Sequence, residues 1–358
     1  MRSPLHRRAA IAALALLTLL PGLNTARAET PPAVIRIGTP GALGPDGQPV
    51  RGSAYGQATI DALEQEFAGT GTKIEWKYFV NVGPGINEAF AGHQIDFANY
   101  GDFPAIIARS SGIPIKLLSP VTRGSLEAYL VVPNGSTAKT IQDLKGKRVA
   151  VNMGRPWMLA FSHLLAANNL KMSDFQIYNL VMPDGDAAVA AGTVDAQFTL
   201  NGLQLQSRGL AKPIWSTLDA PLEWKFVADL FGSEDFINKY PETTQRLVRA
   251  YVRGALYYSQ PEHREEYLQN LAKFQATPYD LIAKEWAHKD AAMVLSPRFD
   301  SFVSQHYQQA IDYAFDNKLI RRKFQATDLF EPRFAEAALK ELEPAQGAAS
   351  GAAKGATR

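Results

Sequence analysis

The chain has 358 residues, no cysteine and nearly balanced charge, with 37 Lys and Arg against 35 Asp and Glu. The absence of cysteine excludes disulfides, iron–sulfur clusters and a thiol nucleophile. A formal net charge of +2 gives no indication of a nucleic-acid partner, and we expect none.

The first 28 residues have the organisation of an export signal. Arg7 and Arg8 precede an apolar run from Ala9 to Leu20, and Ala26-Arg27-Ala28 has the form of a cleavage site. The apolar run is too short to cross a bilayer. Cleavage after Ala28 would remove four arginines and no acidic residue, which lowers the formal net charge to −2. We therefore expect a protein of the periplasm, exported by the general or the twin-arginine route.

Strand and helix patterns alternate through the first part of the remaining chain. In order, they predict a strand at Val34–Ile37, a helix with Ile60, Leu63 and Phe67, a strand at Ile74–Phe79, a helix with Ile86 and Phe90, a strand at Ile95–Tyr100, a helix from Pro104 to about Ser111, and a strand at Ile115–Val121. Such alternation is typical of parallel strands joined by right-handed crossovers, so we expect an α/β fold.

The same pattern begins again near residue 129. It predicts strands at Tyr129–Val132, Val149–Asn152, Gln176–Val181 and Asp195–Thr199, with helices starting at Gly154 and around Ala187. The segment from Ala191 to Ala196 repeats the motif of Ala91 to Asp96, which indicates two similar lobes. From about residue 233 the chain is predicted to be helical, and residues 343–358 have the composition of a disordered tail.

No catalytic or metal-binding constellation is present in the sequence. There is no G-x-S-x-G elbow and no P-loop, and the six histidines form no pair at ligand spacing. Glycines at positions 38, 41, 44 and 47 follow a strand but lack the G-x-G-x-x-G order of a dinucleotide site. We therefore predict a binding protein with no cofactor, no metal and no enzymatic activity.

Loops at the carboxyl ends of predicted strands are the candidate binding site, because open α/β sheets bind ligands there. Helix N-termini in these loops would supply backbone N–H donors for an anion. We expect Arg155 to contact an oxyanion and Trp157 to cover an apolar tail. Other interpretations remain: Asp102 as a helix cap, Trp157 as core, Arg155 as a surface residue. The candidate ligand-binding residues are Thr39, Pro40, Gly41, Tyr55, Tyr100, Gly101, Asp102, Phe103, Gly154, Arg155, Trp157 and Asn201.

A series of short motifs carries a family resemblance. They are Glu88-Ala89-Phe90, Gly92, Ile95-Asp96, Gly101-Asp102-Phe103-Pro104, Gly112, Thr140 to Ala150, Gly192 to Ala196, and Phe315 to Ile320. In this order they resemble the solute-binding proteins of ABC importers for aliphatic sulfonates, nitrate and taurine, which are related to binders of thiamine-pyrimidine precursors. The resemblance extends over about residues 33 to 335.

The resemblance implies a two-lobed periplasmic binding protein of the type II kind. It implies mixed, mainly parallel sheets with helices on both faces, and two hinge crossovers near Glu127–Val131 and Glu223–Ala228. Lobe 1 would comprise residues 29–127 and 228–342, and lobe 2 residues 128–227. A monomer would close over a small sulfonate-like anion and deliver it to an ABC permease and ATPase at the inner membrane.

Three cleft loops depart from the family pattern: the long segment Thr39 to Tyr55, Gly154-Arg155-Pro156-Trp157, and Leu200-Asn201-Gly202. We therefore hypothesise that the ligand is not a simple short alkanesulfonate. The alternatives are another solute of the family (nitrate, taurine or a thiamine-pyrimidine precursor) and a solute sensor that docks on a membrane receptor. Sulfinate desulfinases share this fold, but they use a cysteine nucleophile, which this chain lacks.

Overall fold

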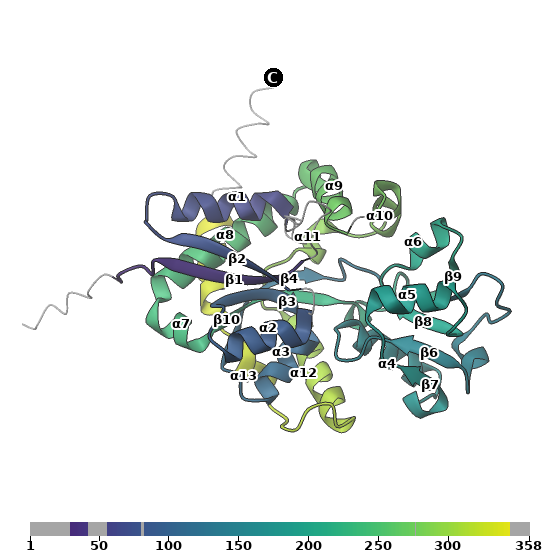
Figure 1. Ribbon diagram of the computed structural model, residues 1–358. Coiled ribbons are helices and arrows are strands. Elements are labelled where there is room, and N and C mark those ends of the chain that lie inside the picture. The colour runs from purple at the N-terminus through teal and green to yellow at the C-terminus, as the bar shows by residue number, and fades with distance from the viewer. Residues whose placement is uncertain (1–28, 42–55, 80–81, 276, 344–358) are drawn as a thin grey trace, which may run out of the picture. The chain divides into compact units, whose positions relative to one another are not determined.

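Two five-stranded sheets organise the chain in the computed structural model, which describes residues 29–41, 56–79, 82–275 and 277–343 (Figure 1). All contacts reported below lie within the compact unit that begins at Pro31. The predictions for the export signal, for Tyr55 and for residues 344–358 of the tail fall outside the described residues.

The first sheet has the strand order β2-β1-β3-β10-β4. Its strands are β1 (Val34–Pro40), β2 (Lys73–Phe79), β3 (Phe97–Gly101), β4 (Ile115–Arg123) and β10 (Val227–Ser233). Strand β1 is parallel to β2 and β3, whereas β10 is antiparallel to both of its neighbours. The chain therefore leaves this sheet after β4 and returns to its interior with β10.

Helices cover both faces of the first sheet (Figure 1). One face packs on α1 (Gly56–Phe67), α7 (Glu234–Lys239) and α8 (Pro241–Tyr258). The opposite face packs on α2 (Val82–Ala91), α3 (Asp102–Ser110), α12 (Ser301–Asp316) and α13 (Ala326–Leu329). Strand residues alternate between the two cores: Ile35 and Ile37 face α1 and α8, while Ala98 and Tyr100 face α2, α3 and α12.

The second sheet has the strand order β7-β6-β8-β5-β9. Its strands are β5 (Tyr129–Pro133), β6 (Arg148–Val151), β7 (Gln176–Tyr178), β8 (Ala196–Thr199) and β9 (Ala211–Ser216). Helix α4 (Trp157–Ala167) packs on one face, and α5 (Met182–Ala190) and α6 (Gly202–Ser207) pack on the other. We call each sheet with its covering helices a lobe.

The remaining elements are short helices. They are α9 (Arg264–Phe274), α10 (Tyr279–Glu285), α11 (Ala291–Val294), a helical segment at residues 333–343, and the 3-10 turns Ile141–Leu144, Met172–Asp174, Leu222–Trp224 and Pro261–His263. A buried aromatic cluster that includes Tyr258, Tyr267 and Trp286 joins α9 and α10 to α8.

The predicted similarity of the two lobes is confirmed by their hydrogen bonds. Arg36, on β1, donates from its backbone N–H and its guanidinium to Asp96, and Arg148, on β6, does the same to Asp195. Asp96 directly precedes β3, and Asp195 directly precedes β8; each of these is the third of the three mutually parallel strands in its sheet. The repeated motif therefore makes the same connection between first and third strand in each sheet.

The α/β fold with mixed sheets is confirmed, with two parallel and two antiparallel strand pairs in each sheet. Some element bounds differ from those predicted. The strand predicted to run to Val181 ends at Tyr178, because Val181 is already the N-cap of α5. The helix predicted from Gly154 begins at Trp157, because Gly154 has a positive φ of 74° that breaks the helical path. The chain passes between sheets after Arg123 and after Ser216; the exact lobe boundaries stay a prediction.

Candidate functional site

Two strand-to-helix turns, one from each lobe, meet at a single point. A Cβ atom added to Gly101, between β3 and α3, would lie 2.0 Å from Cγ of Pro156, just before α4. A Cβ added to Gly83, in α2, would lie 3.1 Å from Cβ of Pro104 and 3.7 Å from the carbonyl oxygen of Gly154. We call these five residues the junction. The turn at Gly101–Pro104 and the segment Gly154–Trp157, which both contain candidate ligand-binding residues, are thus brought together.

The first turns of three helices lie at the junction. Helix α2 begins at Val82, α3 at Asp102 after the N-cap Gly101, and α4 at Trp157 after the N-cap Pro156. The N-terminus of a helix has unpaired backbone N–H groups and carries the positive end of the helix dipole. An anion is the ligand that such an arrangement favours.

The side chains of Tyr100 and Phe103 lie in the core, and their role as ligand contacts stays a prediction. Each is 1% exposed within the cluster under α2, α3 and α12. The Tyr100 hydroxyl donates to Oδ1 of Asn87 at 3.0 Å, and its ring stacks edge-on with Phe231. Strand alternation is the reason: Tyr100 and Ala98 face one core, while Asn99 and Gly101 face the other.

Asp102 is neither an N-cap nor a free carboxylate. Gly101 is the cap, and Asp102 is the first residue of α3. Its Oδ1 accepts from the N–H of Phe103 at 2.7 Å, and its Oδ2 lies 2.5 Å from Nε2 of His306 in α12. Both side chains are at most 2% exposed. The helix-cap interpretation is therefore wrong, and Asp102 instead joins α3 to α12.

A second buried carboxylate, Asp229 of β10, lies beside this pair. It accepts from the Tyr307 hydroxyl and from the N–H of Val121. The pKa of Asp229 is raised to about 7, chiefly by burial; the hydrogen bonds from Tyr307 and Val121 oppose the shift, and the neighbouring carboxylate of Asp102 adds to it. Asp229 is fully buried, so the protonated form is stabilised in the folded state.

We expect Asp229 to make the protein less stable as the pH rises from about 4 to about 7. Its pKa is raised on folding, so in this range the folded state holds a proton that the unfolded state releases. Asp229→Asn should reduce this loss, which is at most a few kcal/mol at about 1.36 kcal/mol per pKa unit. Urea unfolding at pH 5 and pH 8 checks the prediction, and an unchanged pH dependence in the variant would contradict it.

Arg155 is buried at the junction. It is 8% exposed, and its Nε donates to Oδ1 of Asn152 at 2.9 Å. Burial lowers the pKa of Arg155, but an arginine side chain stays cationic in proteins. The surface-residue interpretation is therefore wrong. A cation held beside Gly154 and Pro156 fits the predicted contact with an oxyanion, which stays a prediction.

Trp157 combines the two interpretations that the sequence left open. It is half-buried, and its ring packs against the core cluster of the second lobe. Its indole Nε1 is buried as well, and no described residue accepts a hydrogen bond from it. Part of the side chain is therefore core, while its only polar atom has no hydrogen-bond partner among the described residues.

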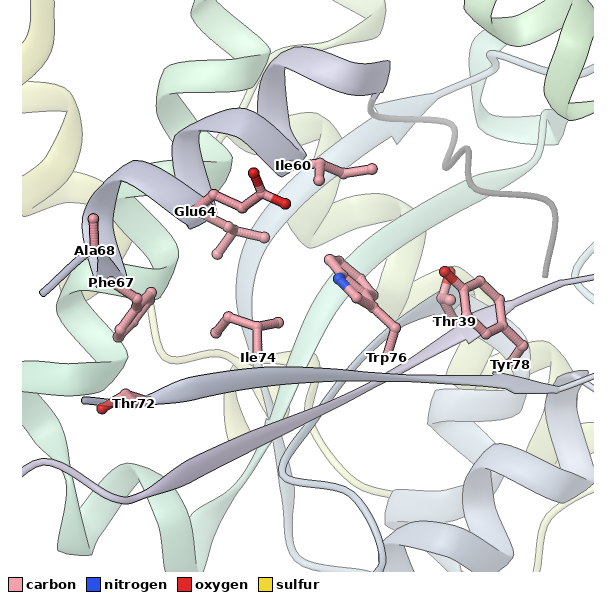
Figure 2. A pocket seen from close by; sticks show the side chains of 10 residues that line it. Thr39, Ile60, Glu64, Phe67, Ala68, Thr72, Ile74, Trp76 and Tyr78 are labelled. Carbon is pink, nitrogen blue, oxygen red and sulfur yellow. The ribbon is translucent and has the colours of Figure 1, made fainter. Parts of the chain in front are cut away.

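Thr39, a candidate ligand-binding residue near the end of β1, lines a separate cavity of about 300 Å³ between α1 and β2. Figure 2 shows Trp76 and Tyr78 of β2 beside Thr39 at one end of this cavity, with Ile60 of α1 opposite. The wall is mostly apolar, and Thr39 is 4% exposed. Pro40 and Gly41 follow directly, and the Gly41 N–H donates to Phe79 at 3.4 Å. Their contact with a ligand stays a prediction.

Asn201 is the N-cap of α6, and its side chain is held by a carboxylate. Its Nδ2 donates to Oδ2 of Asp186 at 2.7 Å, and its backbone N–H donates to Oγ1 of Thr199. Asp186 also accepts from Thr199 and Gln197, and burial raises its pKa. These bonds fix the loop after β8, and a ligand contact of Asn201 stays a prediction.

A buried ionic cluster joins the two segments that connect the sheets. Glu127, whose side chain is 0% exposed, lies 2.7 Å from Nζ of Lys289 and 3.1 Å from Nζ of Lys225, and it accepts from Thr217. Glu127 belongs to the first connecting segment, and Thr217 and Lys225 belong to the second. We call these four residues the crossover cluster. The sequence analysis did not find it, although a glutamate next to the apolar strand β5 was a usable signal.

Further hydrogen bonds join the lobes, among them those of Tyr129 and Ser162. Tyr129 donates to Glu285 of α10 at 2.5 Å, and burial raises the pKa of Glu285 to about 7. Ser162 of α4 bonds to Tyr313 of α12. These contacts add to the close packing of the two lobes at the junction.

Two kinds of site are absent from the described part of the chain. Within residues 29–41, 56–79, 82–275 and 277–343, no group of three or more His, Cys, Asp or Glu side chains is arranged to hold a metal ion. Over the same ranges, no helix has the length and apolarity needed to cross a membrane.

Comparisons with known proteins give one consistent picture. The solved structure of the sulfonate ABC transporter periplasmic sulfonate-binding protein SsuA from Methylobacillus flagellatus KT is 36% identical, with a TM-score of 0.74, covering 87% of this chain and 94% of that one. A protein of Escherichia coli (strain K12) named as an aliphatic sulfonates-binding protein is 26% identical over 70% of this chain and 77% of its own length.

An enzyme shares the fold at greater distance. The crystal structure of the desulfurization enzyme DSZB is 17% identical, with a TM-score of 0.63, covering 86% of this chain and 99% of that one, which shows a common fold alone. A family model described as NMT1/THI5 like matches residues 81–263, which include the junction and the whole second sheet. The chain belongs to the NMT1/THI5-like family and has the periplasmic binding protein fold of that group.

Proposed function

We propose that this protein is the periplasmic solute-binding component of an ABC transporter, and that it captures a sulfonate-like organic anion between its two lobes. The observation that carries the proposal is the junction, where three helix N-termini and the buried cation Arg155 meet across the lobes. The sulfonate-binding names of relatives that match most of the chain support the same substrate class.

The proposed cycle is closure and release. The solute enters while the lobes are apart, the junction closes over it, and the closed form is recognised by a membrane permease with its ATPase. Gly101 and Gly83 suit this cycle because their missing side chains let the lobes approach closely. The fold supports binding without catalysis, since relatives that are 36% and 26% identical are named binding proteins and the chain has no cysteine.

The location and the oligomeric state belong to the same proposal. We infer a periplasmic monomer that has lost residues 1–28 by cleavage after Ala28. The intact mass of exported protein checks the cleavage, and light scattering checks the monomer. Docking on a membrane receptor, with a sensory role, is the other function that a closing solute-binding protein would support.

A binding screen tests the substrate class. The protein of residues 29–358 is mixed in turn with alkanesulfonates, hydroxy- and aminosulfonates, nitrate, phosphonates and pyrimidines, and its thermal unfolding is measured with each. Every solute that raises the unfolding temperature is then titrated by calorimetry. A bound solute at a hundred times its Kd stabilises the fold by about 2.7 kcal/mol. We expect the strongest stabilisation from a sulfonate. Stabilisation by neutral or cationic solutes, with none by any sulfonate, would overturn the proposal.

A further inference from the structure

Two fully buried polar side chains near the junction have no hydrogen-bond partner in the described chain. Asn99 of β3 is 0% exposed, and neither its Oδ1 nor its Nδ2 is paired; Thr122 of β4 is 0% exposed with Oγ1 unpaired. An unsatisfied buried polar group destabilises a fold, so native proteins rarely keep one without a reason. Two such residues in one sheet therefore need an explanation.

The strand register places both side chains on the same face of the first sheet. Across β10, Leu230 is paired with Asn99, and Ala228 is paired with both Gly101 and Thr122. Directly paired residues of antiparallel strands point to the same face, and residues two apart on one strand do so as well. Asn99, Gly101 and Thr122 consequently share the face that packs toward α1 and α8.

This face of the sheet contacts the other lobe at Gly101. The position of the missing Gly101 Cβ, two residues after Asn99, touches Pro156. Beyond Pro156, the indole Nε1 of Trp157 is a further buried donor that no described residue accepts. The row that contains Thr122 otherwise holds only Gly101 and Ala228, the smallest residues. Residues with unpaired polar atoms thus occur close in the chain to both sides of the junction: Asn99 two residues before Gly101, and Trp157 directly after Pro156.

We propose that Asn99 and Thr122 bind the ligand directly, which rests on the proposed function and specifies the substrate class. The Nδ2 of Asn99 and the hydroxyl of Thr122 would donate to sulfonate oxygens. The Oδ1 of Asn99 can only accept, so it requires a donor on the ligand. The preferred substrate is therefore a small sulfonate that also carries a hydroxyl or ammonium group.

Two isosteric sulfonates and two apolar variants test the inference. The probes are 2-hydroxyethanesulfonate, which has a donor, and 1-propanesulfonate, in which a methyl group replaces the hydroxyl. The variants are Thr122→Val and Asn99→Leu, compared with the wild type by calorimetric titration and thermal unfolding. The matched control is Thr244→Val, because the hydroxyl of Thr244 is also fully buried but donates to the carbonyl oxygen of Tyr240 at 2.8 Å.

The expected result separates ligand binding from structural support. The wild type should bind the hydroxysulfonate roughly tenfold more tightly than propanesulfonate, and each variant should lose roughly tenfold or more in affinity for it. Thr122→Val should unfold at the wild-type temperature or above it, since it removes an unpaired polar group. Thr244→Val should unfold at a lower temperature and bind normally.

Three outcomes would overturn the inference. Wild-type affinity in both variants would exclude the two side chains from the site and leave the proposed function intact. Equal binding of the two probes would remove the requirement for a ligand donor. Failure of the wild type to bind any sulfonate of the screen would overturn the proposed function, and this inference with it.

Discussion

Gly101→Ala is expected to weaken sulfonate binding by roughly tenfold to a hundredfold. The new Cβ would lie 2.0 Å from Cγ of Pro156, so the lobes could not approach as closely as they do here. Overpacking of this kind costs about 1–3 kcal/mol, and every 1.4 kcal/mol is a factor of ten in affinity. Since the contact joins the lobes, the cost falls on the closed form.

The stability of the first lobe should change little in this variant. Gly101 has φ −69° and ψ 157°, which any residue adopts, so alanine introduces no backbone strain. The control is Gly135→Ala, where an added Cβ meets nothing within 4 Å and φ is not positive. Affinities are measured by titration calorimetry. Wild-type affinity in Gly101→Ala would show that ligand binding does not require this approach of the two turns.

Glu127→Ala is expected to destabilise the protein by about 3–5 kcal/mol. The side chain of Glu127 is 0% exposed and lies within 3.1 Å of the ammonium groups of Lys225 and Lys289, which are about 10% exposed. Removing one partner of a buried ion pair leaves the other charge buried and uncompensated. The pKa of Lys289 is already lowered by burial, so its charge is poorly solvated without Glu127.

Urea unfolding gives the free energy of this change. The control is Asp312→Ala, which removes a partner of Lys323 in a pair whose two side chains are about 40% exposed, and which we expect to change stability little. A loss below 1 kcal/mol in Glu127→Ala would mean that water solvates both lysines at the crossover. The crossover cluster would then contribute little to the free energy of unfolding.

At the junction, the local sequence pattern predicts the two turns, whereas the tertiary structure determines which side chains face the site. Both strand-to-helix turns were predicted from Gly-Pro signals after short apolar strands, and both exist at β3–α3 and β6–α4. Which side chains of the first turn face the other lobe depends on the orientation of β3. Tyr100 and Phe103 face the core, whereas Asn99, which was not considered, faces the opposite side. A strand of five residues buried on both faces has no polar alternation that would indicate its orientation.

Long-range pairs account for most of what the sequence analysis missed. Asp102 meets His306 at a separation of 204 residues, and Glu127 meets Lys289 and Lys225 from other segments of the chain. Strand β10 inserts between β3 and β4 only after the chain has built the second sheet. No pattern of local periodicity specifies such partners.

The amino-acid sequence by itself determined the alternating α/β elements, the two similar lobes and the family motifs, because each depends on residues close together in the chain. The tertiary structure alone decided which side of β3 faces the junction, which carboxylates are buried with partners, and that Gly101 lies against Pro156. These features depend on strand order and on the packing of one lobe against the other, so residues distant in the sequence set them together.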